Sequence, residues 1–240
     1  MIHNIAHRGA SAYEPENTLR AFERAIQLGA TMMELDIHLS SDGYLMVIHD
    51  PDLARTTNGS GLVPQHTRAE IQRLDAGQGE KIPTLAEVID LVRGRAELYI
   101  EMKGQHTPGP MIEVLRATRF MDQVIAGSFY PWLPQKAKFL EPSLRTSILV
   151  GSSDREIDFI DWALAVDADY IHPCWERAAP EPHKLLTPEL IGAIRQHNLG
   201  IILWHEERPS ELQELVKLDV DGICTNTPDV LTSILRAAGS

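Results

Sequence analysis

Two carboxylates and a histidine lie within one short stretch of the sequence. Glu34 and Asp36 are separated by one residue, so on an extended strand both side chains point to the same face. A turn signal at Asp42-Gly43 then predicts a hairpin that returns His49 toward them. Carboxylates are seldom buried unless they are paired with cations or bind a metal. This face of the strand is therefore predicted to form part of a functional site.

A third carboxylate, Glu101, ends another predicted strand, together with Lys103. If the two strands are neighbours, Glu34, Asp36 and Glu101 form an all-oxygen cluster. Oxygen ligands suit hard cations, so the cluster predicts a site for Mg²⁺ or Ca²⁺. Arg8 and Lys103 offer an alternative, in which they neutralise these acids as buried ion pairs without a metal.

Histidines suit proton transfer because they titrate near neutral pH. His7 directly follows the first predicted strand, and with His49 it is predicted to flank the acids. His38 shares the parity of Asp36 but is expected to lie above the site rather than to act as a ligand. Trp204 ends a predicted strand and is expected to form a wall of the site. The remaining histidines are expected at the surface or in loops: His3, His66, His106, His183, His197 and His205.

Predicted strands and helices alternate along almost the whole sequence. The predicted strands cover residues 2–6, 32–39, 97–103, 124–126, 144–150, 170–173, 199–204 and 220–225. The predicted helices cover residues 18–28, 67–74, 84–92, 110–118, 132–139, 156–165, 188–197, 210–218 and 228–237. Such alternation implies parallel pairing and predicts an α/β fold, a (β/α)8 barrel. In this fold the carboxyl ends of the strands meet at one face, where active sites form.

The region from Pro51 to Lys81 breaks this alternation and is rich in loop residues. It is interpreted as a small insertion after the second strand, too short for a core of its own, so the chain is expected to form one domain over residues 1–240. The first helix is expected to begin at an N-cap provided by Asn17 and to stop at Gly29.

Composition excludes several classes of function. The chain has 240 residues, of which 43% are hydrophobic, and its formal net charge is -12 from 22 basic and 34 acidic residues. Without a basic run, nucleic-acid binding is not expected. The two cysteines, Cys174 and Cys224, show no zinc-binding spacing. No signal peptide or transmembrane stretch is apparent, so a cytoplasmic location is expected. Assembly into a homo-oligomer is left open.

Several short motifs follow one another along nearly the whole chain. They are His7-Arg8-Gly9, Pro15-Glu16-Asn17-Thr18, Glu34-Leu35-Asp36, Asp42-Gly43, His49-Asp50, Arg55-Thr56-Thr57, Gly59 with Gly61, Ile82-Pro83-Thr84-Leu85-Ala86-Glu87-Val88, Glu101-Met102-Lys103, Ser128-Phe129, Trp204 and Asp221-Gly222-Ile223. In their order and spacing the chain resembles the glycerophosphodiester phosphodiesterase family, in its cytoplasmic bacterial form. No single motif is specific, whereas the order and spacing of the first five are.

The resemblance implies hydrolysis of small glycerophosphodiesters to sn-glycerol 3-phosphate and an alcohol, through a cyclic phosphate if the glycerol 2-hydroxyl attacks first. It implies a divalent cation on Glu34, Asp36 and Glu101, an acid–base pair of His7 and His49, and phosphate contacts from Arg8 and Lys103. The alternatives are a lysophospholipase D-like enzyme that acts on lysophospholipids, a lyase that stops at the cyclic phosphate, and a catalytically silent barrel.

The sequence departs from the family pattern at two places. Trp204 is followed by His205-Glu206-Glu207, where the family often has Thr-x-Asn, and Asn226 stands where the family often has Asp. Neither departure is expected to touch the proposed cation or histidines. Both are expected to affect only how the headgroup is recognised.

Overall fold

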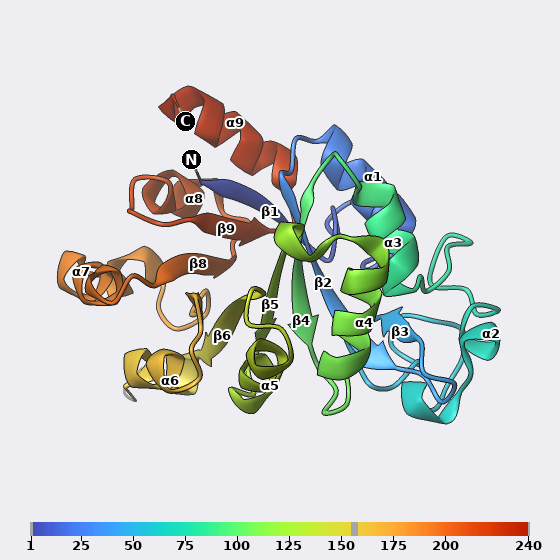
Figure 1. Ribbon diagram of the computed structural model, residues 1–240. Coiled ribbons are helices and arrows are strands. Elements are labelled where there is room, and N and C mark those ends of the chain that lie inside the picture. Colours follow the sequence, from blue (N-terminus) through green and yellow to red (C-terminus); the bar gives the residue numbers. More distant parts are fainter. Residues whose placement is uncertain (1, 155–157, 240) are drawn as a thin grey trace.

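Eight parallel strands close into a barrel in the computed structural model, which describes residues 2–154 and 158–239 (Figure 1). β1 pairs with both β2 and β9, so the sheet closes on itself and confirms the predicted fold class. The barrel strands are β1 (His3–His7), β2 (Met32–Leu39), β4 (Glu97–Met102), β5 (Val124–Ser128), β6 (Arg145–Gly151), β7 (Tyr170–Cys174), β8 (Gly200–His205) and β9 (Gly222–Thr225). A further short strand, β3 (Leu45–Val47), pairs antiparallel with β2 and forms the predicted hairpin.

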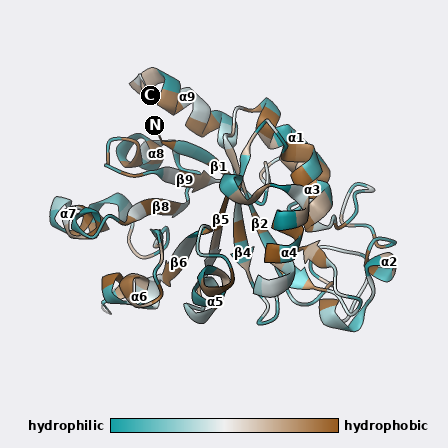
Figure 2. Ribbon diagram, viewed as in Figure 1, coloured by the Kyte–Doolittle hydropathy of each residue, from teal (hydrophilic) through white to brown (hydrophobic). Residues whose placement is uncertain are grey.

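Helices surround the barrel (Figure 1). They are α1 (Leu19–Gln27), α3 (Leu85–Val92), α4 (Pro108–Thr118), α5 (Trp132–Leu140), α6 (Phe159–Ala165), α7 (Pro188–Gln196), α8 (Pro209–Leu215) and α9 (Pro228–Ala238). In Figure 2, single helices carry both hydrophobic and hydrophilic residues, as expected for helices that cover a barrel. The predicted start of the helix over residues 156–165, residue 156, lies outside the described residues. None of the described helices has the length and apolar character needed to cross a membrane.

The first helix begins one residue later than predicted. The Oγ1 atom of Thr18, not the side chain of Asn17, caps α1 by accepting the N–H of Ala21 at 3.2 Å. Asn17 instead adopts a left-handed backbone, with φ 58°, and donates its amide to Asp36. The predicted N-cap was therefore wrong, because a buried carboxylate competes for the same side chain. Gly29 follows the last turn with φ 91°, as its predicted role as a helix stop requires.

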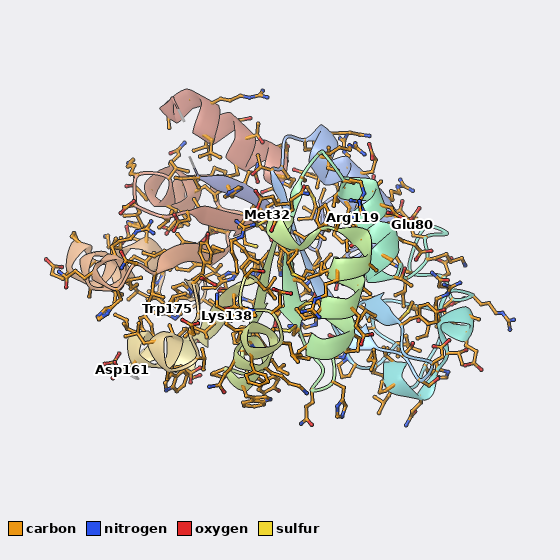
Figure 3. The ribbon with its side chains drawn as sticks, in the orientation of Figure 1. Met32, Glu80, Arg119, Lys138, Asp161 and Trp175 are labelled. Carbon is orange, nitrogen blue, oxygen red and sulfur yellow. The ribbon has the colours of Figure 1, made fainter. Side chains whose placement is uncertain are left out.

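The hydrophobic core has two layers, inside and outside the strands. Residues of one parity fill the barrel, among them Ile5, Met32 and Tyr99. Residues of the other parity pack against the helices, as Met33 and Leu98 do. Figure 3 shows Met32 among the strands, whereas the exposed Asp161 lies at the periphery. This packing fixes the strand register, and with it the direction in which polar side chains of the strands point.

The insertion after β3 packs around a small apolar cluster that it shares with the hairpin. It contains a 3-10 turn (Val63–Gln65) and the helix α2 (Arg68–Ile71), which the predicted Thr67/Glu70 capping box starts. The apolar cluster consists of Met46, Ile48, Leu53, Val63, Ile71, Ala76 and Ile82. Because Met46 lies on β3 and Ile48 directly follows it, the cluster anchors the insertion to the hairpin that carries His49.

The barrel interior beside Tyr99 is too tight for a larger residue at position 127. We expect Gly127→Ala to destabilise the fold by about 1–3 kcal/mol, the usual effect of overpacking a core. A Cβ there would collide with the Tyr99 hydroxyl and approach Leu149 Cδ1 to 2.8 Å. Denaturant unfolding measures the change.

A matched control is Gly192→Ala in α7, where a Cβ meets nothing within 4 Å. That variant is expected to gain about 0.5–1 kcal/mol, because alanine favours a helix more than glycine does. Equal effects of the two substitutions would contradict this account of the barrel interior.

Candidate active site

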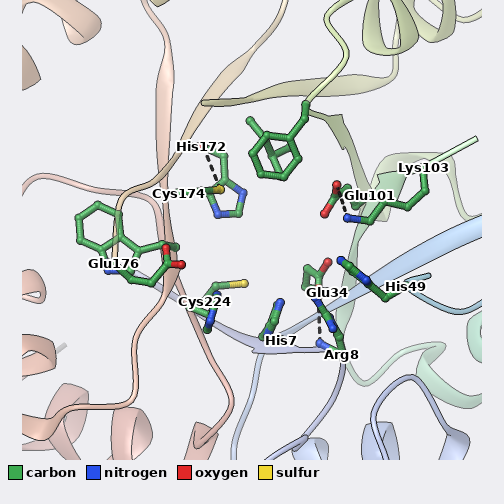
Figure 4. Close-up of a pocket in the computed structure, with 14 residues that line it drawn as sticks. His7, Arg8, Glu34, His49, Glu101, Lys103, His172, Cys174, Glu176 and Cys224 are labelled. Carbon is green, nitrogen blue, oxygen red and sulfur yellow. Dashed lines mark hydrogen bonds and ion pairs between the residues drawn. The ribbon is translucent and has the colours of Figure 1, made fainter. Parts of the chain in front are cut away.

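The carboxyl ends of the strands surround a pocket of about 190 Å³ (Figure 4). Its lining residues are His7, Arg8, Glu34, His49, Glu101, Lys103, Phe129, Leu149, His172, Cys174, Glu176, Trp204, His205 and Cys224. Seven of the eight site residues predicted from the sequence are in this lining. The eighth, Asp36, is fully buried and does not reach the pocket surface.

The three predicted acids form one cluster. A carboxylate oxygen from each of Glu34, Asp36 and Glu101 lies within 4.8 Å of the others. The register explains this, because β2 and β4 are neighbours and Asp36 lies opposite Glu101. Lys103 Nζ lies 2.6 Å from Glu101 Oε1 and 3.3 Å from Asp36 Oδ1, and Arg8 Nε lies 3.4 Å from Asp36 Oδ2. Arg8 and Lys103 therefore form ion pairs with the acid cluster, as the alternative without a metal requires.

The two basic side chains do not neutralise the whole cluster. Asp36 and Glu101 have ion pairs, but Glu34 forms none with any described residue and instead accepts the backbone N–H of Arg8 at 2.9 Å. Oδ1 of Asp36 is buried and has no hydrogen-bond partner. Burial, followed by the charge of Asp36, raises the pKa of Glu34 well above its usual range.

The pKa of Glu101 is likewise raised, to about 7, mainly by burial. Three clustered carboxylates, a buried carboxylate oxygen without a hydrogen bond and raised carboxyl pKa values fit a divalent cation, which would bind the ionised carboxylates. Glu34, Asp36 and Glu101 could therefore hold such an ion.

Arg8, the first residue after β1, has an unusual backbone conformation. Its φ is 56°, a left-handed conformation that is rare for a bulky residue. The conformation is held by hydrogen bonds from Arg8 N to Glu34 O at 3.0 Å and from Asn17 N to Arg8 O at 3.0 Å. Strain of this kind is often kept where a side chain must take one direction. Here it places the guanidinium group beside the acid cluster.

A network of charged side chains holds His49. Its Nδ1 lies 2.5 Å from Asp50 Oδ1, and Asp50 also accepts from Arg55 Nε at 2.5 Å. Arg55 reaches Glu16 at 2.8 and 2.9 Å, and Glu16 accepts from Arg8 Nη1 at 3.0 Å. Hydrogen bonds from Arg55 and His49 lower the pKa of Asp50 to about 2, although burial alone would raise it. His49 therefore faces a carboxylate that stays charged at neutral pH.

His7 has different surroundings. Its Nδ1 lies 2.6 Å from Asn226 Oδ1, so its side-chain partner is a neutral amide. The ring of His205 stacks on the His7 ring, with 4.4 Å between centroids and 5° between planes. Burial, followed by His205 and Arg8, lowers the pKa of His7 well below its usual value. These surroundings favour the neutral form of His7.

The far wall of the pocket is formed by β7 and β8. Figure 4 shows Glu176 on the side opposite Lys103 and His49. Trp204 is almost fully buried in this wall, as predicted. The pairing of β8 with β9 shifts register between Leu203 and His205, which indicates a bulge at Trp204. The bulge lets two consecutive residues, Trp204 and His205, both line the pocket.

Comparison with known proteins identifies the family of the chain. The model of the glycerophosphoryl diester phosphodiesterase family matches residues 7–230. The chain belongs to this family. A glycerophosphodiester phosphodiesterase of Caldanaerobacter subterraneus is 35% identical, over 98% of both chains. A second relative with that name, from Bacillus subtilis, is 34% identical over 98% of this chain and 87% of its own.

Solved structures agree with the sequence comparison. A glycerophosphodiester phosphodiesterase from Agrobacterium tumefaciens matches with a TM-score of 0.85 and 30% identity, over 97% of this chain and 100% of that one. An Oleispira antarctica phosphodiesterase, solved with the product sn-glycerol 3-phosphate, matches with a TM-score of 0.86 and 27% identity, over 97% and 96%. The family and the class of enzyme predicted from the sequence, a phosphodiesterase, are confirmed.

The two departures from the family pattern do reach a proposed catalytic histidine, contrary to the sequence-based expectation. Asn226 contacts His7 directly, and His205 stacks on it instead of lying at the surface or in a loop. Glu207 accepts a hydrogen bond from Asn226 Nδ2. The pattern of the sequence showed where the chain differs from the family, but not that these strand ends meet at His7.

Asp50, Arg55 and Glu16 belong to the motifs, but the sequence predicts no role for them. The adjacency of His49 and Asp50 was the available signal, because a carboxylate next to a histidine often orients its ring. The prediction for His38 agrees with the structure. His38 lies outside the acid cluster, and its Nε2 is 3.0 Å from the carbonyl oxygen of His49.

Proposed function

We propose that the chain hydrolyses glycerophosphodiesters to sn-glycerol 3-phosphate and an alcohol, with a divalent cation, Mg²⁺ or Ca²⁺, held by Glu34, Asp36 and Glu101. The observation that carries the proposal is the convergence of two histidines, two basic side chains and a three-carboxylate cluster at one pocket. Family membership supports the same reaction. The product bound to the Oleispira antarctica relative supports the product assigned here.

Electrostatic stabilisation of the phosphate is the role proposed for Arg8 and Lys103. A phosphodiester carries one negative charge, and the transition state of its cleavage concentrates more charge on the phosphate oxygens. The planar guanidinium group of Arg8 can bind two of these oxygens, whereas Lys103 offers a point charge. When bound, the cation would supply further positive charge at the phosphate. Asp36 contacts both basic side chains and holds them at the pocket.

The different partners of the two histidines suggest different roles. Burial lowers the pKa of His49, but the ionised carboxylate of Asp50 opposes this effect and favours a protonated ring. His49 is therefore proposed as the acid that protonates the leaving alcohol. His7 is paired with the neutral amide of Asn226 and stacks on a second imidazole, both of which favour a neutral ring. His7 is therefore proposed as the base that takes a proton from the attacking hydroxyl.

The attacking group is proposed to be the glycerol 2-hydroxyl, as the family resemblance implies. Attack by this hydroxyl forms a cyclic phosphate and releases the alcohol, and water then opens the ring. Phosphorus NMR of the reaction distinguishes this course from direct attack by water. Accumulation of the cyclic phosphate as the final product would instead favour a lyase.

A panel of substrates tests the proposed function. Glycerophosphocholine and glycerophosphoethanolamine are expected to release sn-glycerol 3-phosphate. His7→Ala protein, purified by the same procedure, serves as the control for contaminating activity. Lysophosphatidylcholine is expected to be a poor substrate, because the pocket of about 190 Å³ has no room for an acyl chain. Such a chain would have to lie on the exposed rings of Phe129, Tyr130 and Trp132. A higher kcat/KM for lysophosphatidylcholine than for either small diester would overturn the proposed substrate class.

Other expectations from the sequence stay predictions. They are a substrate contact from Trp204, a single domain over residues 1–240, a location in the cytoplasm and assembly into homo-oligomers.

A further inference from the structure

A chain of hydrogen bonds leads from His7 to the surface of the protein. His7 Nδ1 lies 2.6 Å from Asn226 Oδ1, and Asn226 Nδ2 donates to Glu207 Oε1. His7 ends β1, Asn226 directly follows β9, and Glu207 is the second residue after the end of β8. These three strands are consecutive in the barrel. Glu207 is exposed, whereas His7 lies in the pocket lining. A surface carboxylate is thus connected to an active-site imidazole through one amide.

The chemistry of the three groups fixes the proton on His7. A carboxylate only accepts hydrogen bonds, so the Asn226 atom that faces Glu207 must be the donor, Nδ2. The atom that faces His7 is then Oδ1, which only accepts. His7 Nδ1 must therefore carry a proton. In the neutral ring, Nε2 is then the unprotonated nitrogen and can accept a proton.

Ser11 does not determine this orientation. Its hydroxyl lies 2.9 Å from Asn226 Oδ1 and 2.7 Å from the carbonyl oxygen of His7. A hydroxyl can donate or accept, so Ser11 would fit either orientation of the amide. Among the described side chains that contact the Asn226 amide, only Glu207 excludes the reversed orientation, in which Asn226 would donate to His7 and the proton of the ring would move to Nε2.

We propose that Glu207 is a positioning residue that, through Asn226, holds His7 in the Nδ1–H tautomer. The stacked ring of His205 holds the plane of the imidazole while the amide fixes its proton. The benefit to catalysis rests on the proposed function, in which Nε2 of His7 accepts a proton from the attacking hydroxyl. Control of the tautomer itself does not depend on that function and can be measured without turnover.

Nitrogen NMR of isotopically labelled protein supplied with Mg²⁺ tests the proposal, because it distinguishes the two tautomers of each histidine. The His7 signals are assigned by their loss in His7→Ala. The wild-type protein is expected to show the Nδ1–H form of His7. In Glu207→Gln the new amide can both donate and accept, so both orientations of Asn226 become allowed and the Nε2–H form appears. Glu207→Ala removes the acceptor and is expected to give the same mixture.

Two further variants sharpen the test. Glu113→Gln removes an exposed carboxylate from α4 and is expected to leave the His7 signals unchanged. Asn226→Asp combined with Glu207→Gln restores a group at position 226 that only accepts from His7, and it is expected to return the pure Nδ1–H form. This reversal separates control of the tautomer from a loss of folding, which thermal unfolding of each variant checks independently.

Kinetics report whether the tautomer matters for the proposed reaction. With glycerophosphocholine, kcat of Glu207→Gln is expected to fall by about two- to tenfold with KM nearly unchanged, because only molecules with an unprotonated Nε2 can use His7 as the base. A wild-type Nε2–H form, or a Glu207→Gln spectrum identical to wild type, would overturn the proposal. An altered spectrum with unchanged kcat would support control of the tautomer and overturn the role of His7 as the base.

Discussion

Removal of divalent cations abolishes hydrolysis of glycerophosphocholine, and Mg²⁺ or Ca²⁺ restores it: this is the result we expect from the cluster of Glu34, Asp36 and Glu101. The reason is electrostatic, since the three carboxylates, when ionised, carry one more negative charge than Arg8 and Lys103 offset. An anionic substrate does not approach that charge unless a cation offsets it. Activity after exhaustive chelation, followed by titration with each metal, measures the effect. Full turnover by the metal-free protein would contradict the expectation.

The same site predicts a stability change that does not depend on activity. At a metal concentration about 100 times Kd, binding adds about 2.7 kcal/mol and raises the Tm of a chain of this size by roughly 5–10 °C. Glu34→Gln should weaken binding by about 100-fold or more, because even supporting residues of metal sites contribute about 10- to 100-fold. Glu176→Gln is the matched control, since Glu176 lines the same pocket on its other side.

The pH dependence of this stabilisation has a defined sign. Burial raises the pKa of Glu101 from 4.5 to about 7 in the cation-free protein. Between pH 4.5 and about pH 7, Glu101 of the unfolded chain has lost a proton that the folded chain keeps. Rising pH therefore destabilises the cation-free folded form. A cation binds the ionised carboxylate and removes this penalty. The metal-induced rise in Tm is therefore expected to be larger at about pH 8 than at about pH 5, which calorimetry can measure.

Substitution of the two histidines is expected to have different consequences for different leaving groups. Both His7→Ala and His49→Ala should lower kcat for glycerophosphocholine by about 10²–10⁴-fold, the usual contribution of a general acid or base. With a glycerophosphodiester of p-nitrophenol, whose leaving group needs no proton, His49→Ala should recover most of its activity. His7→Ala should not recover, because the attacking hydroxyl still has to lose its proton.

This comparison tests the assigned roles directly, since each substrate serves as the control for the other. Recovery of His7→Ala instead of His49→Ala would reverse the assignment. Equal losses on both substrates for both variants would show that neither histidine transfers the proton of the leaving group. Far-UV circular dichroism and thermal unfolding establish that each variant remains folded.

The acid cluster could be predicted from the sequence because it depends on rules that are local. The period of two along a strand fixes the common direction of Glu34 and Asp36, and the Asp42-Gly43 turn returns His49. Glu101 required only the inference that β2 and β4 are neighbours, which the alternation of strands and helices supplies.

The surroundings of the histidines could not be predicted, because they depend on how chain ends and loops meet. Asn226 and Glu207 approach His7 from segments about 200 residues away in sequence, and no periodicity specifies such a contact. The bulge at Trp204 also shifts the strand parity, so His205 was expected at the surface or in a loop. Asn17 shows a third cause, since tertiary contact with Asp36 overrode a local capping preference.

The pairing of β1 with β9 has a consequence for the synthesis of the protein. A ribosome releases β1, with His7 and Arg8, early, but β1 lacks one of its two neighbouring strands until residues 222–225 have emerged. Asn226, the partner of His7, follows that last strand directly. A nascent chain thus carries its acid cluster long before the surroundings of His7 exist. Closure of the barrel by β9 therefore also completes the surroundings of His7, so chains that end before β9 are expected to be inert.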